Sequence, residues 1–139
     1  MTVINVSDVE YLATRLASAQ RSFDDAEGTY SLRAPHLLES CVVAPFQRHS
    51  GKALYPSLVA KAGILFYFLI KTRPFVSGNK RVAVAALLTF LFLNKKWIKV
   101  DTPELFSFAV WVAQSPNELK DQVVEAIQKF IQIHLVKST

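Results

Sequence analysis

The sequence has only one cysteine, Cys41, which excludes the structural features that need two or more thiols. A single thiol excludes an internal disulfide bond and a metal site built from cysteines. We therefore predict no disulfide, and we expect none of the candidate site residues to be a metal ligand. Sparse cysteine also fits the reducing interior of a cell, so the expected location is cytoplasmic.

Long hydrophobic runs and a secretory signal are also missing. The longest uninterrupted apolar stretches are "AGILFYFLI" and "VAVAALL". Even "VAVAALLTFLFL" is shorter than the ~18 residues that a membrane-spanning helix needs. The N-terminal "MTVINVSDVE" lacks the basic start and apolar core of a signal peptide. The sequence thus predicts no association with a membrane.

The chain has no internal repeat, low-complexity segment or linker, so its 139 residues predict a single domain, residues 1–139. Apolar residues make up 51% and charged residues 19%, which indicates a globular protein with a substantial core. The net charge of +5 suits an anionic ligand or an acidic partner. Nucleic acid is not the favoured partner, because the basic residues form no helical stripe interleaved with aromatic residues.

Hydrophobic periodicity and helix-start signals predict an all-α bundle of about six helices. Ser7 with Glu10, and Ser115 with Glu118, have the spacing of capping boxes. The segments 21–35 and 45–57 are polar or rich in proline and glycine, so we expect loops there, and "WIKV" is expected to be a short extended link. The helices are expected at about residues 8–19, 36–43, 58–71 and 80–94, then from 102–103 onward, and from 115–116 to about 136.

Two of these predicted helices belong at the centre of the bundle. "LVAKAGILFYFLIK" and "KRVAVAALLTFLFLNKK" are apolar nearly all round, which is typical of a helix buried on every side. The nine residues "RPFVSGNKR", 73–81, join them. This polar and cationic loop is therefore held by the best-packed part of the predicted fold.

The composition of the loop predicts a binding site for an anion. Pro74 disfavours helical geometry at the preceding residue, and Gly78 supplies a permissive backbone where the next helix begins. A helix start offers unpaired backbone N–H groups and the positive end of the helix dipole. Asn79 could cap the helix or donate to an oxygen, Lys80 adds charge, and Arg81 could hold a phosphate with two parallel hydrogen bonds. The alternative is an ordinary helix connection whose cations lie in solvent.

"RPFVSGNKR" resembles the signature of the Fic/Doc family, usually written His-Pro-Phe-x-Asp/Glu-Gly-Asn-Gly/Lys-Arg. Lys80 is similar to the death-on-curing branch, Doc. The likeness extends over about residues 32–100, including "LLESCVVAPF", "ALYPSLVAKAGILFYFLIK" and "RVAVAALLTFLFLN". The resemblance implies an all-helical domain that binds the phosphates of ATP or another nucleotide and transfers part of it to a protein hydroxyl. Most Fic proteins move AMP, whereas Doc moves the terminal phosphate.

The resemblance also implies roles for individual residues. The segment around Gly78 would bind phosphate oxygens together with Asn79, Lys80 and Arg81. Phe75, preceded by Pro74, would pack inward and anchor the loop.

Two positions depart from the family signature. Arg73 stands where the family has its catalytic histidine, and a guanidinium, with a pKa above ~12 and no acceptor lone pair, is no general base near neutral pH. Ser77 stands where the family has an acidic ligand for Mg²⁺, a cation that prefers carboxylate oxygens. Mg²⁺ is therefore implied by the resemblance but poorly supported by the residues, and we expect impaired activity.

Arg73 has three competing explanations: an inactivating exchange in a cloned toxin, a natural non-catalytic family member, or a phosphate clamp in another reaction. A change made on purpose at one position would not account for Ser77 as well. His49 is a candidate substitute base, since related proteins place this segment near the mouth of the active site. His36 and His134 are expected on helix surfaces.

The implied partners are proteins. The self-inhibitory Ser/Thr-x-x-x-Glu-Gly/Asn motif of some Fic proteins has no match, since Ser22 and Glu27 in "SFDDAEG" are one residue too far apart. A separate antitoxin is therefore expected, with a disordered tail that folds onto the toxin. The expected substrate is a protein such as a translation factor, which in Doc is elongation factor Tu. The sequence does not decide whether the chain forms a homodimer.

The sequence is compatible with two functions. The first is a Doc-like toxin, a transferase of the protein kinase or adenylyltransferase type with weakened activity. The second is a non-catalytic module on the same fold that binds a nucleotide or a protein.

Overall fold

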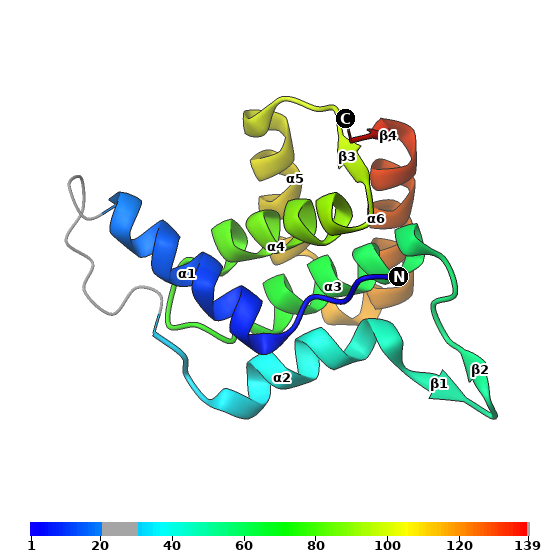
Figure 1. Cartoon of the computed structure of the whole chain (residues 1–139), viewed down its shortest axis with the longest axis horizontal. Coiled ribbons are helices and arrows are strands. Elements are labelled where there is room, and N and C mark those ends of the chain that lie inside the picture. Colours follow the sequence, from blue (N-terminus) through cyan, green and yellow to red (C-terminus); the bar gives the residue numbers. More distant parts are fainter. Residues whose placement is uncertain (21–30, 139) are drawn as a thin grey trace.

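The computed structural model describes residues 1–20 and 31–138, and the described residues form a helical bundle, as predicted (Figure 1). Two short 3₁₀ turns, η1 (Ala44–Phe46) and η2 (Asn117–Leu119), and four strands of two or three residues accompany the helices. The six α-helices are α1 (Val6–Gln20), α2 (Pro35–Val43), α3 (Leu58–Thr72), α4 (Asn79–Leu93), α5 (Thr102–Gln114) and α6 (Lys120–His134).

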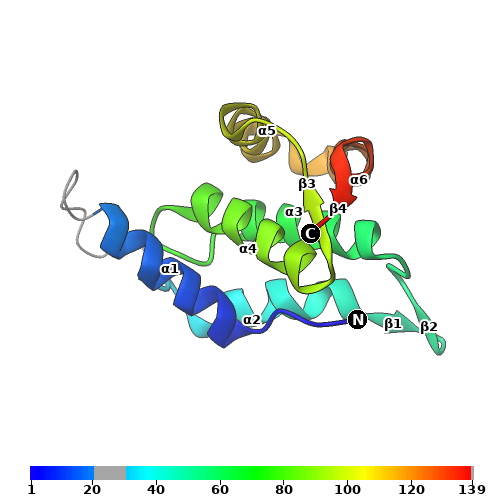
Figure 2. The same ribbon diagram turned by 45° about the horizontal axis from the view of Figure 1, so that its top comes forward.

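The helices form three layers with α3 and α4 in the middle. Figure 2 shows α1 and α2 on one side of this pair and α5 and α6 on the other. Because both of its faces are covered, α3 buries nine of the ten residues from Lys61 to Ile70, all except Phe68. The prediction of two central hydrophobic helices joined by the motif loop is confirmed.

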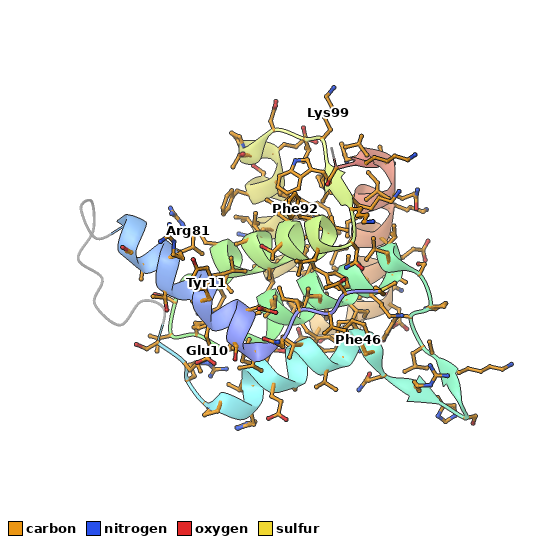
Figure 3. All side chains as sticks on the ribbon, viewed as in Figure 1. Glu10, Tyr11, Phe46, Arg81, Phe92 and Lys99 are labelled. Atoms are coloured by element: carbon orange, nitrogen blue, oxygen red, sulfur yellow. The ribbon has the colours of Figure 1, made fainter. Side chains whose placement is uncertain are left out.

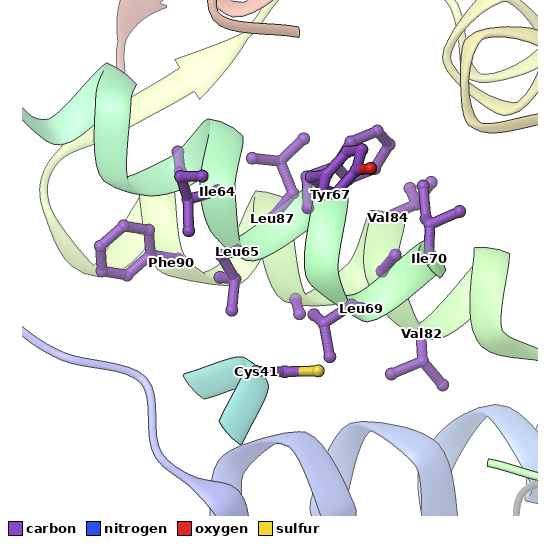
Figure 4. Packing of buried hydrophobic residues seen from close by; sticks show 14 of the residues in the cluster. Cys41, Ile64, Leu65, Tyr67, Leu69, Ile70, Val82, Val84, Leu87 and Phe90 are labelled. Carbon is purple, nitrogen blue, oxygen red and sulfur yellow. The ribbon is translucent and has the colours of Figure 1, made fainter. Parts of the chain in front are cut away.

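The core between the middle helices consists of large aliphatic and aromatic side chains. Phe66, Phe90 and Leu87 are fully buried, and Figure 4 shows the α3 and α4 side chains meeting above Cys41 of α2. Burial raises the pKa of the Cys41 thiol to about 11. The thiol is therefore protonated at neutral pH, which excludes it as a nucleophile.

Helix starts differ from the predicted capping boxes in two places. The backbone N–H of Asp8 donates to Asn5 Oδ1, and that of Asn5 donates to Asp8 Oδ2, both at 2.9 Å. The reciprocal pair therefore begins at Asn5, which has the same spacing as the box that we predicted from Ser7. Ser115 ends α5 instead of starting the last helix, because its hydroxyl donates to Val112 O at 2.6 Å.

The end of the last helix and the segment before α3 contain strands that the sequence did not predict. Helix α6 stops at His134, and β4 (Leu135–Lys137) pairs antiparallel with β3 (Lys96–Ile98), which overlaps the first two residues of the "WIKV" segment expected to be extended. The pairing places Leu135 opposite Ile98, which is buried. A second ribbon of β1 (Arg48–His49) and β2 (Lys52–Ala53) occupies part of the segment expected to be irregular.

In the described part of the chain, no helix combines the length and the apolar character needed to cross a bilayer.

Candidate functional site

The motif loop leaves α3 through an unusual backbone conformation. Helix α3 ends at Thr72, and Arg73 follows with φ 53° and ψ 62°, in the left-handed region. Pro74 and Phe75 then turn inward and are buried, with Phe75 only 1% exposed. The next residues, Val76 and Ser77, return to the surface. The buried Phe75 ring therefore anchors the middle of the loop, while Arg73 before it and Val76 and Ser77 after it are exposed.

Asn79 closes the loop from its far end. Its side chain is 7% exposed and points into the protein. Asn79 Oδ1 accepts the backbone N–H of Phe75, and Asn79 Nδ2 donates to the backbone carbonyl of the same residue, both at 2.9 Å. One amide thus satisfies both backbone groups of a buried residue, which would otherwise lack partners in the core.

Gly78 lies at the start of α4 and gives it an open N-terminus. Its φ of 79° and ψ of 10° belong to the left-handed region that glycine adopts without strain. Because glycine has no side chain, the N-cap residue itself supplies no side-chain hydrogen bond to the first turn of α4. The first helical hydrogen bond runs from Val82 N to Gly78 O. The preceding N–H groups and the positive end of the helix dipole therefore lie at the loop, where Lys80 and Arg81 are also exposed.

A third segment, residues 31–33, runs antiparallel beside the loop. Val76 N donates to Ser31 O and Arg33 N donates to Pro74 O, both at 2.8 Å, and Leu32 pairs with Phe75 between them. The Arg33 side chain adds hydrogen bonds from Nε to Arg73 O at 2.6 Å and from Nη2 to Thr72 O at 2.9 Å. The loop is thus held both from inside the core and from its outer side.

A family model supports the sequence resemblance. The model of the Fic/DOC family matches residues 4–91, which include the described helices α1 to α3, the motif loop and most of α4. The chain belongs to the Fic/DOC family. It is also 36% identical over 74 residues to "Toxin Doc" of Mycolicibacterium smegmatis (strain ATCC 700084 / mc(2)155). This match covers 53% of the chain and 57% of that relative.

Arg73, which the sequence resemblance aligns with the histidine of the family signature, is exposed at the C-terminal end of α3. His49, the candidate substitute base, is excluded by its position. It lies in the β1–β2 ribbon, which precedes α3, whereas the motif loop follows α3. Figures 1 and 2 both show the ribbon and the loop at opposite ends of this helix, which is 15 residues long, or about 22 Å. The expectation that His49 lies near the site is therefore wrong.

The other histidines are placed by their helices. His36 is exposed in the first turn of α2, as expected. His134 ends α6, with Nδ1 2.8 Å from Phe130 O and Nε2 3.8 Å from Glu104 Oε2. Its ring lies 4.5 Å from that of Phe130, so it is part of an aromatic contact and is only partly exposed.

The donor set at the loop does not fit a dedicated magnesium site. Ser77, which the sequence resemblance aligns with the acidic residue of the family signature, offers only a hydroxyl, and Mg²⁺ prefers carboxylate oxygens. Across the described residues, no three His, Cys, Asp or Glu side chains come together as metal ligands. Ser22 and Glu27, the near match to the inhibitory motif, lie outside the described residues.

Two hollows occur away from the motif residues. One, of about 490 Å³, is lined by apolar groups of α4, β3 and β4, including Phe92 and Trp97. The other, of about 390 Å³, lies between α3, α6 and the segment that follows β2, and Asp121 and Glu125 contribute to its wall. Figure 3 shows Arg81 at the end of α4 beside α1 and Phe92 toward the other end. Neither hollow contains the cations of the motif.

Proposed function

We propose that this chain is a Doc-like toxin of a toxin–antitoxin pair, and that its motif loop binds the phosphates of ATP or another nucleotide. The observation that carries the proposal is the start of α4. Gly78, the N-cap residue, places no side chain over the first turn, and Lys80 and Arg81 place two cations beside it. A helix N-terminus with adjacent cations favours an anion through both its N–H groups and its dipole.

Different residues of the loop make different contributions to binding a phosphate. The N–H groups around Gly78 donate hydrogen bonds, Lys80 supplies a compact charge, and Arg81 supplies a planar fork suited to two phosphate oxygens. Asn79 holds the loop through Phe75, so we give it a positioning role. Direct contact between Asn79 and a phosphate stays a prediction from the family signature.

The proposed chemistry is transfer of a phosphoryl group or AMP from ATP to a protein hydroxyl, with ADP or pyrophosphate as the respective leaving group and with activity impaired in this chain. A base must accept the proton of the attacking hydroxyl, and Arg73 has no acceptor atom for it. Ser77 removes the carboxylate that would hold a metal.

The same two departures favour a second candidate, a non-catalytic module that binds a nucleotide or a protein. Both altered positions belong to the chemistry, whereas the groups that bind anions are retained. Binding without turnover requires only the retained groups.

The proposed partners follow from the family. The similarity to "Toxin Doc" supports a separate antitoxin as the protein that inhibits this chain. The proposed substrate is a protein of the translation machinery, and the proposed location is the cytoplasm. A homodimer stays a prediction that oligomeric-state measurements would decide.

Replacing Arg81 with alanine is expected to weaken ATP binding about 10- to 100-fold, which corresponds to the loss of one or two charge-assisted hydrogen bonds. Isothermal titration calorimetry on the purified chain measures the change. Arg48→Ala is the matched control, because Arg48 is an exposed arginine in the distant β1–β2 ribbon. Equal ATP affinity for the two variants and the unaltered chain would remove the phosphate role of Arg81.

A further inference from the structure

Two helix ends of opposite polarity meet at the motif loop. The N-terminus of α4 carries partial positive charge from its N–H groups, and the C-terminus of α3 carries partial negative charge from its last carbonyls. Only residues 73–78 separate the two ends. An anion attracted by α4 is therefore also exposed to repulsion from the carbonyls of α3.

The side chain of Arg33 binds two of these carbonyls. Its Nε donates to Arg73 O at 2.6 Å and its Nη2 donates to Thr72 O at 2.9 Å. The planar guanidinium thus spans the last helical residue of α3 and the left-handed residue that follows it. A full positive charge at this place offsets the negative end of the α3 dipole.

The backbone of Arg33 is bonded to the same loop. Its N–H donates to Pro74 O at 2.8 Å, so the residue contacts three consecutive carbonyls, those of Thr72, Arg73 and Pro74. Arg73 has a φ of 53°, a left-handed backbone conformation that is energetically unfavourable for a residue other than glycine. The hydrogen bond from Arg33 favours this conformation.

We infer that Arg33 is a positioning residue for the anion site: it neutralises the carbonyl end of α3 and fixes the path of the loop toward α4. This inference rests on the proposed binding of phosphate at the start of α4. It adds a residue that lies 40 positions from Arg73 and outside the "RPFVSGNKR" motif.

Two substitutions distinguish the neutralisation of the α3 carbonyls from the positioning of the loop. Arg33→Ala removes the charge and both side-chain hydrogen bonds. Arg33→Lys keeps a charge near the carbonyls but lacks the planar fork that reaches two of them at once. If neutralisation matters, lysine restores part of the affinity for an anion. Arg48→Ala is the control, since Arg48 also donates from Nη2 to a carbonyl, that of Gly51, but in the distant ribbon.

The first measurement uses the ligand-free chain. Amide hydrogen exchange followed by NMR reports opening of the loop at Phe75 and Val76, whose N–H groups bond to Asn79 and Ser31. We expect exchange at both amides to be at least about tenfold faster in Arg33→Ala, smaller acceleration in Arg33→Lys, and no change in Arg48→Ala. Unchanged exchange in Arg33→Ala would contradict the positioning of the loop.

The second measurement titrates inorganic tripolyphosphate into the same variants by calorimetry. We expect the affinity to fall about tenfold or more in Arg33→Ala, and less in Arg33→Lys. Equal affinity in the unaltered chain and Arg33→Ala would overturn the neutralising role. If the alanine variant does not fold, Arg33→Lys decides: full affinity together with unchanged exchange would overturn the inference.

If the proposed function is wrong, the titrations give a different result from the one expected when only the role of Arg33 is wrong. If the unaltered chain binds neither tripolyphosphate nor ATP, then phosphate binding at α4 is wrong and the inference about the anion site falls with it. The exchange measurement still tests whether Arg33 orders the loop, because it needs no ligand.

Discussion

An Arg73→His, Ser77→Asp double variant is expected to transfer label from radiolabelled ATP to a protein hydroxyl at least about 100-fold faster than the unaltered chain, because a positioned base contributes ~10²- to 10⁴-fold. Histidine supplies the acceptor nitrogen that arginine lacks. Aspartate supplies a carboxylate that can hold Mg²⁺ beside the phosphates. Labelling of lysate proteins, resolved by gel electrophoresis, measures the transfer.

The structure accommodates both substitutions. Residues 73 and 77 are exposed, so neither new side chain has to fit into the core. Histidine is also among the residues that adopt left-handed backbone geometry more readily than most, which suits φ 53° at position 73. We therefore expect the double variant to fold as stably as the unaltered chain.

The control for this gain is Arg73→Gln, Ser77→Asn, which has similar shapes but neither a base near neutral pH nor a carboxylate. It is expected to remain at background. A double variant that is folded and still inert, next to an active family member in the same assay, would contradict the catalytic interpretation and favour the binding module.

Asn79→Ala is expected to lower the free energy of unfolding by about 2–4 kcal/mol, because two buried backbone groups lose their partners at about 1–3 kcal/mol each. Those groups are the N–H and the carbonyl of Phe75, which is 1% exposed. The loop would also lose its link to α4, so phosphate affinity should fall with stability. Urea denaturation followed by circular dichroism measures the change in stability.

Asn94→Ala is the matched control for this prediction. Asn94 ends the same helix and also uses its amide to bond backbone groups, those of Thr2 and the carbonyl of Phe90. Those contacts are more exposed and far along α4 from the loop, so we expect a smaller loss of stability and unchanged ATP affinity. If Asn79→Ala lowered the free energy of unfolding no more than Asn94→Ala, the Phe75–Asn79 contact would not be the interaction that anchors the loop.

The helices were predictable because their signals are local. The segments of α3 and α4 are apolar on all sides over four turns, and that pattern has no alternative to burial at the centre of a bundle. Helix ends were less predictable. Several residues with capping chemistry compete within one turn, and Asn5 forms the cap that Ser7 was expected to form. The strand after α6 depends on pairing with residues 96–98, a distant segment that no local pattern reveals.

The site was only partly predictable for the same reason. The motif letters indicated an anion site at Gly78, and its left-handed geometry follows from the residue type. The inward orientation of Asn79 depends on the burial of Phe75, which a linear motif does not specify. Arg33 belongs to a polar segment with no spacing relation to the motif, so its contacts with Thr72 and Arg73 could be found only in the folded chain.

The most direct test of this account is an NMR titration of the ¹⁵N-labelled chain with ATP. Binding at the start of α4 predicts the largest amide shifts at Gly78, Asn79 and Lys80, with weaker effects at Arg33, and tripolyphosphate should reproduce the same pattern. Shifts centred on the apolar hollow around Phe92 and Trp97, or no shifts at millimolar ATP, would contradict the claim that this loop binds phosphate.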